Sequence, residues 1–263
     1  MPRALWTAAS GMTAQQFNVD LIANNIANVN TTGFKKQRTD FQDQFYDIKM
    51  QPGASAGQQG HNPTGVQVGM GVNVSGTTRI FTAGNLEPTG RTLDVAIEGD
   101  GFFEVQLPDG ATTAYTRAGD FRLDGNGRLV TPDGYYVQPA ITIPDGVSEN
   151  DISIASDGTV SVTQNNVQTT VGQLTLARFR NNSGLLAIGR NLFEASDASG
   201  TVQTGTPNSS GYGGLRGGML EKANVESVTE LVNLIVAQRA YEMNSKSITT
   251  ADQMLRTAND LIR

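Results

Sequence analysis

The sequence predicts a mainly β protein of the α+β class, in which paired N- and C-terminal coiled-coil helices carry an inserted all-β domain. Three observations support this prediction. Large apolar or aromatic residues recur every seven positions near both ends of the chain, the apolar period changes to two at Val66, and six Asp-Gly pairs punctuate the middle. A seven-residue repeat is typical of helices that pack in a supercoil, whereas a two-residue period is typical of half-buried strands.

The chain is acidic and contains no cysteine. Its 263 residues carry a formal net charge of −6, with an isoelectric point near 4.8. This charge argues against nucleic acid or an anionic membrane as a partner, and the lack of cysteine excludes disulfides and thiolate chemistry. No run approaches the roughly 18 apolar residues that a membrane-spanning helix requires. We therefore expect no nucleic-acid partner and no direct membrane insertion.

The first predicted element is a helix over residues 3–30. Its apolar seam has a spacing of seven: Leu5, Met12, Val19 and Ile26. We expect the helix to end between Asn28 and Gly33, where Asn, Thr and Gly accumulate as stop signals. A secretory leader is the alternative interpretation of the first ten residues, but the apolar stretch is short and Thr7 interrupts it. The sequence therefore predicts a helix that is not cleaved off.

A connector is predicted to follow, over residues 34–65. Its apolar residues are numerous enough to dock a short element: Phe41, Phe45, Tyr46 and Ile48. From Gln51 to Gly65 the composition changes to Gly, Gln, Ser, Pro and Ala, which offers little to bury. We expect this second part to be ordered only by contacts with another molecule.

The predicted β domain covers residues 66–221. Alternation of apolar residues from Val66 to Val74 predicts a half-buried strand, and further strand-like runs follow: 93–97, 102–107, 121–123, 135–137, 152–154, 159–163 and 174–179. Asp-Gly is a strong turn signal because both residues tolerate a positive φ. We interpret residues 184–218 as a Gly- and Ser-rich return toward the C-terminus.

The last predicted element is a long helix from Asn224 to Arg263, part of a terminal helical domain formed by residues 1–33 and 222–263. The span from Glu221 to the end has neither Gly nor Pro. Its seam combines large and small residues: Leu234, Ala237, Tyr241, Asn244, Ile248, Ala251, Leu255, Ala258 and Ile262. A helix packed on its own globular core is the alternative, but a length of about 60 Å and the matching N-terminal seam favour helix pairing.

No pattern in the chain predicts a catalytic, metal or cofactor site. The single histidine, His61, has neither Cys nor an acidic residue nearby. Asp94, Glu98 and Asp100 could serve as general acid and base, but we interpret them as the solvated flanks of a turn. The loop at Asp124 lacks the acidic ligands of a calcium loop, and the Gly-rich segment 211–218 lacks the Gly-Lys-Ser/Thr of a phosphate loop. We therefore expect a protein that is not an enzyme and has no cofactor.

Both ends of the chain carry motifs that resemble those of the bacterial flagellar rod and hook proteins. The N-terminal motif runs from Ala23 to Asn28 and continues through Thr31, Gly33 and Phe34. The C-terminal motif comprises segments 224–232, 237–246 and 250–255, and segment 93–103 is similar to a core motif of the family's β domain. The resemblance extends over essentially the whole chain, and its total length and ends are most similar to the distal rod members.

The resemblance implies a structural subunit that polymerises into a hollow helical drive shaft. Terminal helices would form the inner tube and a protein-export channel, the β domain would lie outside, and motor torque would pass along the shaft to the hook. Implied partners are other copies, other rod proteins and the hook protein, the surrounding P-ring and L-ring, and the flagellar export apparatus. The implied location is the basal body, from the periplasm to the outer membrane, after export without a cleaved signal peptide. A proximal rod or hook-type subunit is the alternative within the family.

The residues expected to pack between subunits come from the seams and the motifs. Those of the N-terminal region are Leu5, Met12, Val19, Asn24, Asn25, Ile26, Ala27, Asn28, Gly33 and Phe34. Those of the C-terminal helix are Leu234, Ala237, Gln238, Arg239, Tyr241, Asn244, Ile248, Ala251 and Leu255. The resemblance also implies a rod-stiffening insert, represented by Tyr46, Gln51, Pro52, Gly53 and Gly65. A secreted glycan-binding or glycan-cleaving protein and a trimeric surface adhesin remain alternatives from other classes.

Overall fold

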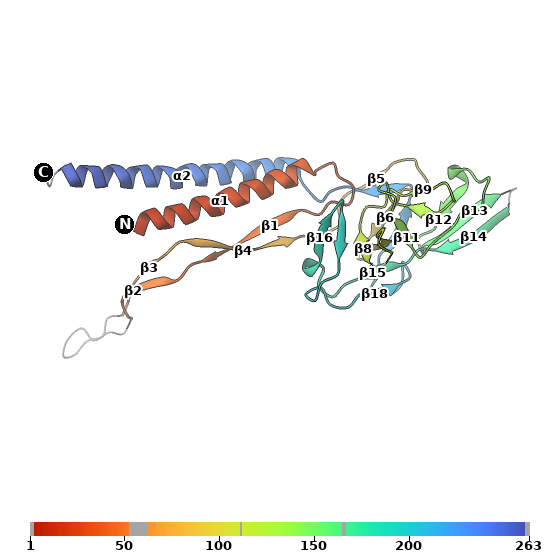
Figure 1. The fold of residues 1–263 in the computed structure, drawn as a ribbon, viewed down its shortest axis with the longest axis horizontal. Helices are drawn as coiled ribbons and strands as arrows, with labels where there is room; N and C mark the ends of the chain where they lie inside the picture. Colours follow the sequence, from red (N-terminus) through yellow and green to blue (C-terminus); the bar gives the residue numbers. More distant parts are fainter. Residues whose placement is uncertain (1–2, 53–62, 111, 165–166, 261–263) are drawn as a thin grey trace. The chain divides into compact units, whose positions relative to one another are not determined.

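The computed structural model describes residues 3–52, 63–110, 112–164 and 167–260, and has a helix near each end of a mainly β chain (Figure 1). Helix α1 covers Arg3–Ala27 and helix α2 covers Ser227–Asp260, which confirms the α+β class and both terminal helices. The chain divides into two compact units. Unit 1 comprises residues 1–27, 37–78 and 226–263, and unit 2 comprises residues 28–36 and 79–225.

In unit 1, α1 and α2 lie side by side and run in opposite directions (Figure 1). The Asn244 side chain of α2 lies against Gly11 of α1. A Cβ atom added to Gly11 would lie 2.8 Å from the Asn244 side-chain nitrogen, so glycine leaves room for that amide. The cost of a glycine inside a helix, about 1 kcal/mol relative to Ala, is therefore offset by close packing of the two helices.

Unit 1 also contains two strand pairs. Strand β1 (Gln37–Asp43) pairs with β4 (Val72–Arg79), and β2 (Tyr46–Met50) pairs antiparallel with β3 (Val66–Gly69). We had expected the apolar residues of this segment to dock a short element, but they remain exposed: Phe41, Phe45, Tyr46 and Ile48. Phe45 is 91% exposed. The docking prediction was wrong: β1 contacts α1, but Phe41, Tyr46 and Ile48 lie at strand positions that the described elements leave exposed, and Phe45 lies between β1 and β2.

The half-buried strand predicted from Val66 to Val74 is two strands instead. Gly71 lies between β3 and β4 and has a φ of +121°, a backbone conformation that favours glycine and interrupts the extended run. All four residues of β3 are exposed. Residues 37–78, which we had divided between a connector and the β domain, thus belong to the same unit as the helices.

Unit 2 is built from antiparallel strands in several small sheets. Its largest sheet has the order β16-β17-β8-β7-β11-β10-β9, and a second sheet has the order β12-β13-β14. Three two-stranded pairs complete the described part: β15 with β18, β19 with β6, and β20 with β5. The strand bounds are Leu86–Pro88 for β5, Val95–Glu98 for β6, Phe103–Gln106 for β7, Thr113–Thr116 for β8, Arg122–Leu123 for β9, Leu129–Val130 for β10 and Tyr136–Gln138 for β11. Those of the remaining strands are Ile152–Ile154 for β12, Thr159–Gln164 for β13, Val167–Gln173 for β14, Leu176–Arg178 for β15, Leu186–Gly189 for β16, Leu192–Glu194 for β17, Gln203–Gly205 for β18, Gly214–Gly217 for β19 and Met219–Glu221 for β20.

The predicted Gly-rich return over residues 184–218 is a structured part of these sheets. Strand β17 pairs with β8, β18 with β15, and β19 with β6, so this segment supplies partners to strands that precede it in the chain. Its apolar content is low because several of these strands lie at sheet edges, where few side chains need burial. The composition of this segment therefore did not indicate its four strands, β16 to β19.

The core of unit 2 has two clusters of buried side chains. The larger includes Val95, Phe103, Phe121 and Leu176, all without exposed surface. The smaller is aromatic, and Phe102 lies at its centre with edge-to-face neighbours: Phe81, Phe179 and Phe193. Edge-to-face pairs each add about 0.5–1.5 kcal/mol beyond area burial, so this cluster fixes the side-chain arrangement as well as the fold.

Candidate subunit interface

Only part of the predicted seam of α2 is covered. Ala237 is buried, and four further seam residues are partly buried: Leu234, Asn244, Ile248 and Ala251. On α1 the seam residues Leu5, Met12, Val19 and Ile26 are likewise partly buried. Residues Gln238, Arg239, Tyr241 and Leu255, which we also expected at interfaces, are exposed. The two helices thus pack side by side within one copy, and the predicted interface residues divide between partly buried and exposed positions.

A second apolar face of α2 is uncovered. It consists of exposed large side chains: Val228, Leu231, Val232, Ile235, Val236, Met243 and Met254. Val228 is 71% exposed. At about 25 cal/mol per Å² of buried apolar surface, covering such a face would be strongly favourable. Single exposed apolar residues are ordinary on proteins, but a continuous set on one helix is typical of an interaction surface.

Two Asn side chains bind consecutive residues of the segment that follows α1. In unit 1, buried Asn25 accepts a hydrogen bond from the Gln37 N–H (3.0 Å) and donates one to the Gln37 carbonyl (2.9 Å). In unit 2, Asn224 accepts from the Lys36 N–H (2.8 Å) and donates to the Ile80 carbonyl (2.8 Å). These bonds replace the ladder that a neighbouring strand would supply, which explains why poor helix formers occupy these positions.

Another Asn of the same motif closes the turn after α1. In unit 2, the Asn28 side-chain oxygen accepts a hydrogen bond from the Thr31 hydroxyl (3.2 Å), and its backbone carbonyl accepts from the Thr31 N–H (3.1 Å). Gly33 follows with a φ of +68°, and a Cβ added there would lie 2.6 Å from the Ala118 backbone nitrogen. The motif thus ends the helix and docks the chain on unit 2, and Phe34 is buried there.

A buried cluster of three charged side chains was not predicted from the sequence. Lys35, Arg117 and Glu221 are each at most 1% exposed. The Glu221 carboxylate accepts hydrogen bonds from Lys35 Nζ (2.5 Å), from Arg117 (3.2 Å) and from the Gly84 N–H (2.8 Å). Lys35 also donates to the Thr82 carbonyl (2.7 Å). Burial lowers the pKa of Lys35, and the Arg117 charge adds to this effect while Glu221 opposes it.

This cluster anchors in unit 2 the two segments that lead to the terminal helices. Lys35 lies after α1, Glu221 precedes α2, and Arg117 comes from the loop after β8. Lys35 belongs to the N-terminal motif and could have been singled out, but its partners lie far away in sequence and carry no local signal.

The described residues of the predicted insert divide between the two ends of the β2–β3 pair: Tyr46 pairs with Gly69 at one end, whereas Gln51, Pro52 and Gly65 adjoin the Met50–Val66 pair at the other. Tyr46, Gln51 and Pro52 are exposed, and Gly65 is partly buried. A Cβ added to Gly65 would lie 2.5 Å from the Met50 carbonyl oxygen, so the strands approach closely there. Gly53 and His61 lie outside the described residues. A stiffening role for this insert is thus a prediction that the geometry does not test.

The acidic residues considered for catalysis do not converge. Asp94 is buried, not solvated as we had expected, because its neighbours belong to the core strand β6. Its carboxylate lies 3.3 Å from the Arg91 guanidinium, whereas Glu98 forms an exposed ion pair with Arg216 at 2.7 Å. Within the ranges that the structure describes, no group of three or more His, Asp or Glu residues is placed to hold a metal ion. Neither described helix has the length and hydropathy needed to cross a membrane.

Three flagellar families match separate parts of the chain. Residues 5–35 match the family described as "Flagella basal body rod protein". This range covers most of α1 and the Asn-rich motif. Residues 96–162 match the "Flagellar hook protein FlgE/F/G D1 domain", in unit 2. Residues 216–261 match "Flagellar basal body rod FlgEFG protein C-terminal". This range contains α2.

Several curated proteins are similar to this chain over its whole length. The flagellar basal-body rod protein FlgG of Borreliella burgdorferi is 52% identical over 100% of both chains. The proteins of the same name from Caulobacter vibrioides and Bacillus subtilis are 49% and 42% identical, over 98% and 100% of this chain and 99% and 100% of their own. A flagellar hook protein FlgE of Helicobacter mustelae is 47% identical over 52% of this chain and 30% of its own length.

Proposed function

Because the chain belongs to the FlgG family of flagellar basal-body rod proteins, we propose that its terminal helices assemble many copies into a hollow helical shaft, the distal rod. Family membership makes the chain a structural subunit of the flagellar rod, located in the basal body. The assembly geometry, the export channel and the transmission of torque to the hook are the proposed part. A proximal rod or hook-type subunit is the alternative.

The observation that carries the proposal is the second apolar face of α2. Helix α1 packs beside α2, and residues such as Val232 and Ile235 remain more than half exposed. A surface that does not pack within its own copy must contact a different surface on the next copy. Such head-to-tail contacts do not close into a dimer and instead propagate a helical array. The seams would then form coiled coils both within and between copies.

Unit 2 would be carried on the outside of the shaft. Its cores are closed by its own strands, and its aromatic cluster is buried, so it needs no neighbour for stability. Outside the tube it would face the P-ring and L-ring as a bushing. Other rod proteins and the hook protein would bind at the two ends of the shaft, and the flagellar export apparatus would deliver subunits without a cleaved leader. We propose no enzymatic activity.

The experiment is polymerisation of the purified full-length chain, followed by electron microscopy. We expect hollow rods above a critical concentration. Ile235→Asp, on the uncovered face, should raise that concentration by at least tenfold while leaving the circular dichroism of the dilute subunit unchanged. Asn233→Asp is the matched control and should assemble normally. Stalked trimers or featureless globules in place of rods would contradict the proposal.

Complementation distinguishes the distal rod from its alternative. We expect expression of this chain to restore motility in a strain that lacks its own distal rod subunit, and not in strains that lack a proximal rod subunit or the hook subunit. Restoration of one of the latter two strains would favour the alternative.

A further inference from the structure

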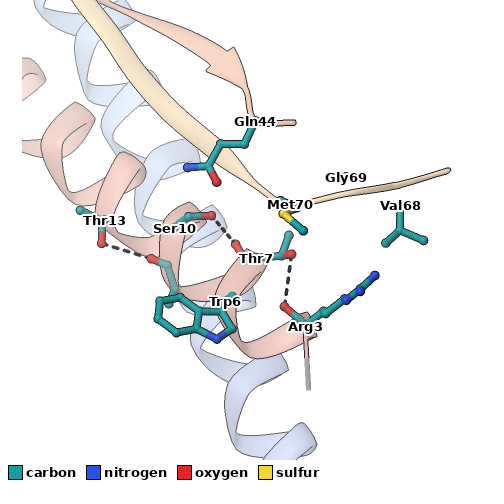
Figure 2. Close-up of a pocket in the computed structure, with 10 residues that line it drawn as sticks. Arg3, Trp6, Thr7, Ser10, Thr13, Gln44, Val68, Gly69 and Met70 are labelled. Atoms are coloured by element: carbon teal, nitrogen blue, oxygen red, sulfur yellow. Dashed lines mark hydrogen bonds between the residues drawn. The ribbon is translucent and has the colours of Figure 1, made fainter. Parts of the chain in front are cut away.

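A groove of about 500 Å³ lies between the start of α1 and the β2–β3 pair, within unit 1 (Figure 2). Trp6, Ser10 and Thr13 of α1 line one side, and Val68 and Met70 line the other. Trp6 is 67% exposed and projects from α1, whereas Met70 comes from the segment that follows β3 (Figure 2). The groove is thus lined by the large aromatic side chain of Trp6 and by the apolar side chains of Val68 and Met70.

The end of α2 extends beyond the helix that it pairs with. Gly11 faces Asn244 and the helices are antiparallel, so the described start of α1, at Arg3, lies level with Asp252. Residues 253–260 of α2 have no part of α1 opposite them, as Figure 1 shows. We call this segment the overhang; it projects by about 12 Å. Its exposed Met254 (70%) and Leu255 find no apolar partner along α1.

The described ends of α1 and α2 carry opposite helix-dipole charges, and Arg256 of the overhang forms an ion pair with Asp252. The first turn of α1 contains no acidic residue, so its positive helix end is uncompensated, and Arg3 and Lys49 share the single carboxylate of Asp47. The last turn of α2 contains no basic residue and ends at Asp260, so its negative helix end is uncompensated as well. Each end lacks the charge that the other supplies.

We propose that the overhang of one copy docks in the groove of a second copy, with Met254 and Leu255 against Trp6 and Met70. A thioether beside an indole ring is a favourable contact. The overhang is continuous with α2 and points away from α1, so it reaches its own groove only if the helix breaks. A second copy supplies the same segment without this cost, and repetition of the contact is head-to-tail.

This inference rests on the proposed polymerisation and names its contact. The test places a photo-crosslinking phenylalanine analogue at position 6 of the full-length chain, in rods assembled from equal amounts of unlabelled and isotope-labelled copies. We expect mixed-label crosslinks between position 6 and the tryptic peptide 247–256, which contains Met254 and Leu255. The same analogue at exposed Val167 of β14 is the control and should not crosslink to that peptide.

The outcomes separate the groove contact from polymerisation itself. Rods in which position 6 crosslinks to another peptide, to another protein, or only within its own copy would overturn the groove contact while leaving the proposed function intact. Failure of the wild-type chain to form rods would overturn both.

A charge exchange gives a second measurement. Met254→Glu and Trp6→Lys should each raise the critical concentration at least tenfold, and the double variant should recover most of the loss, because the new charges attract each other. Asn259→Asp is the control on the overhang. Normal assembly of Met254→Glu, or a double variant no better than the single variants, would overturn the contact.

Discussion

At the scale of single residues, one buried carboxylate is the shared counter-charge of two buried cations. Glu221 accepts from Lys35, Arg117 and the Gly84 backbone, and the Arg117 guanidinium also donates to the Gly99 carbonyl at 2.7 Å. The cluster therefore has a formal charge of +1 when Lys35 is protonated. Desolvation of this excess charge is the reason that burial lowers the pKa of Lys35.

Removal of the Glu221 charge should destabilise the protein more than removal of the Lys35 charge. Glu221→Gln leaves two buried cations without a counter-charge, and we expect the free energy of unfolding to fall by about 3–5 kcal/mol. Lys35→Met leaves the Arg117–Glu221 pair neutral, and we expect a loss of no more than about 1 kcal/mol. Urea denaturation at pH 7 measures both. Equal losses of unfolding free energy in the two variants would show that the excess positive charge does not determine the stability of the cluster.

The Lys35 substitution should also change the dependence of stability on pH. A cation whose pKa is lowered by folding binds fewer protons in the folded state, so stability rises with pH from the lowered pKa up to the unfolded value near 10.5. In that alkaline window, the difference between the wild type and Lys35→Met should shift in favour of the wild type. A constant difference across the window would contradict the lowered pKa.

Asp120 should respond to pH in the acid range. Its burial raises its pKa above the ordinary 3.8, with the Asp94 charge adding to the effect and Arg122 and Arg91 opposing it. The folded state then binds more protons, and stability is lost as pH rises through this raised pKa. Asp120→Asn should remove the loss, so the variant should gain stability relative to the wild type between pH 4 and pH 7. Parallel pH profiles would disprove this.

At the scale of elements, the α1–α2 contact depends on small side chains. Ala237 is 2% exposed, whereas Ala251, opposite the start of α1, is only partly buried. Ala237→Leu should overpack the contact and cost about 1–3 kcal/mol, and Ala251→Leu should cost less. Asn233→Leu, at an exposed position of the same helix, is the control. Thermal unfolding of the dilute subunit measures all three, and normal rod assembly and motility of Ala237→Leu would count against this helix placement.

The sequence predicted the helices better than the strands because helical patterns are local. The seams of Leu234, Ala237 and Asn244 repeat over several turns, so α2 could be assigned from its own residues. Strands β16 to β19 are short, and β17 and β19 are stabilised by partners far away in the chain, β8 and β6. Exposed apolar residues such as Phe45 carry the same pattern as a buried strand, so alternation alone could not distinguish them.

The candidate interface was predicted in part for the same reason. The seams could be located by spacing, and Asn25 could be singled out because asparagine is a poor helix former. Its backbone partner, Gln37, could not be named, since the hydrogen bond depends on how the chain turns after α1. Arg117 and Glu221 look like ordinary surface residues in the sequence, and only the fold removes them from water.

At the scale of the whole molecule, the two units differ in how much of their apolar surface they bury. Unit 2 has two buried clusters, whereas unit 1 leaves α2 and the β2–β3 pair largely exposed. An isolated two-stranded pair is only marginally stable in water. Unit 1 therefore depends on neighbouring copies for part of its stability, whereas unit 2 does not.

Hydrogen exchange should reveal this difference directly. In a dilute subunit we expect the amides of α1 and α2 to exchange much faster than those of β7 and β13, because local opening is easiest where few apolar contacts form. In assembled rods the same helices should be protected. Full protection of both helices in the dilute subunit would contradict the proposal that polymerisation orders them.

The division of the chain has a practical consequence for anyone who wishes to isolate the β portion. The chain crosses between the units after Ala27, Lys36, Thr78 and Val225, so residues 28–36 belong to unit 2 although both flanks belong to unit 1. A fragment of residues 79–225 alone would lack Phe34 and Lys35 and would expose the surface against which these two buried residues pack. Arg117 and Glu221 would then lack the Lys35 partner of the buried charge cluster. A minimal expressible fragment must therefore splice 28–36 back in through an artificial tether, and gene truncations that ignore this peptide should yield insoluble material.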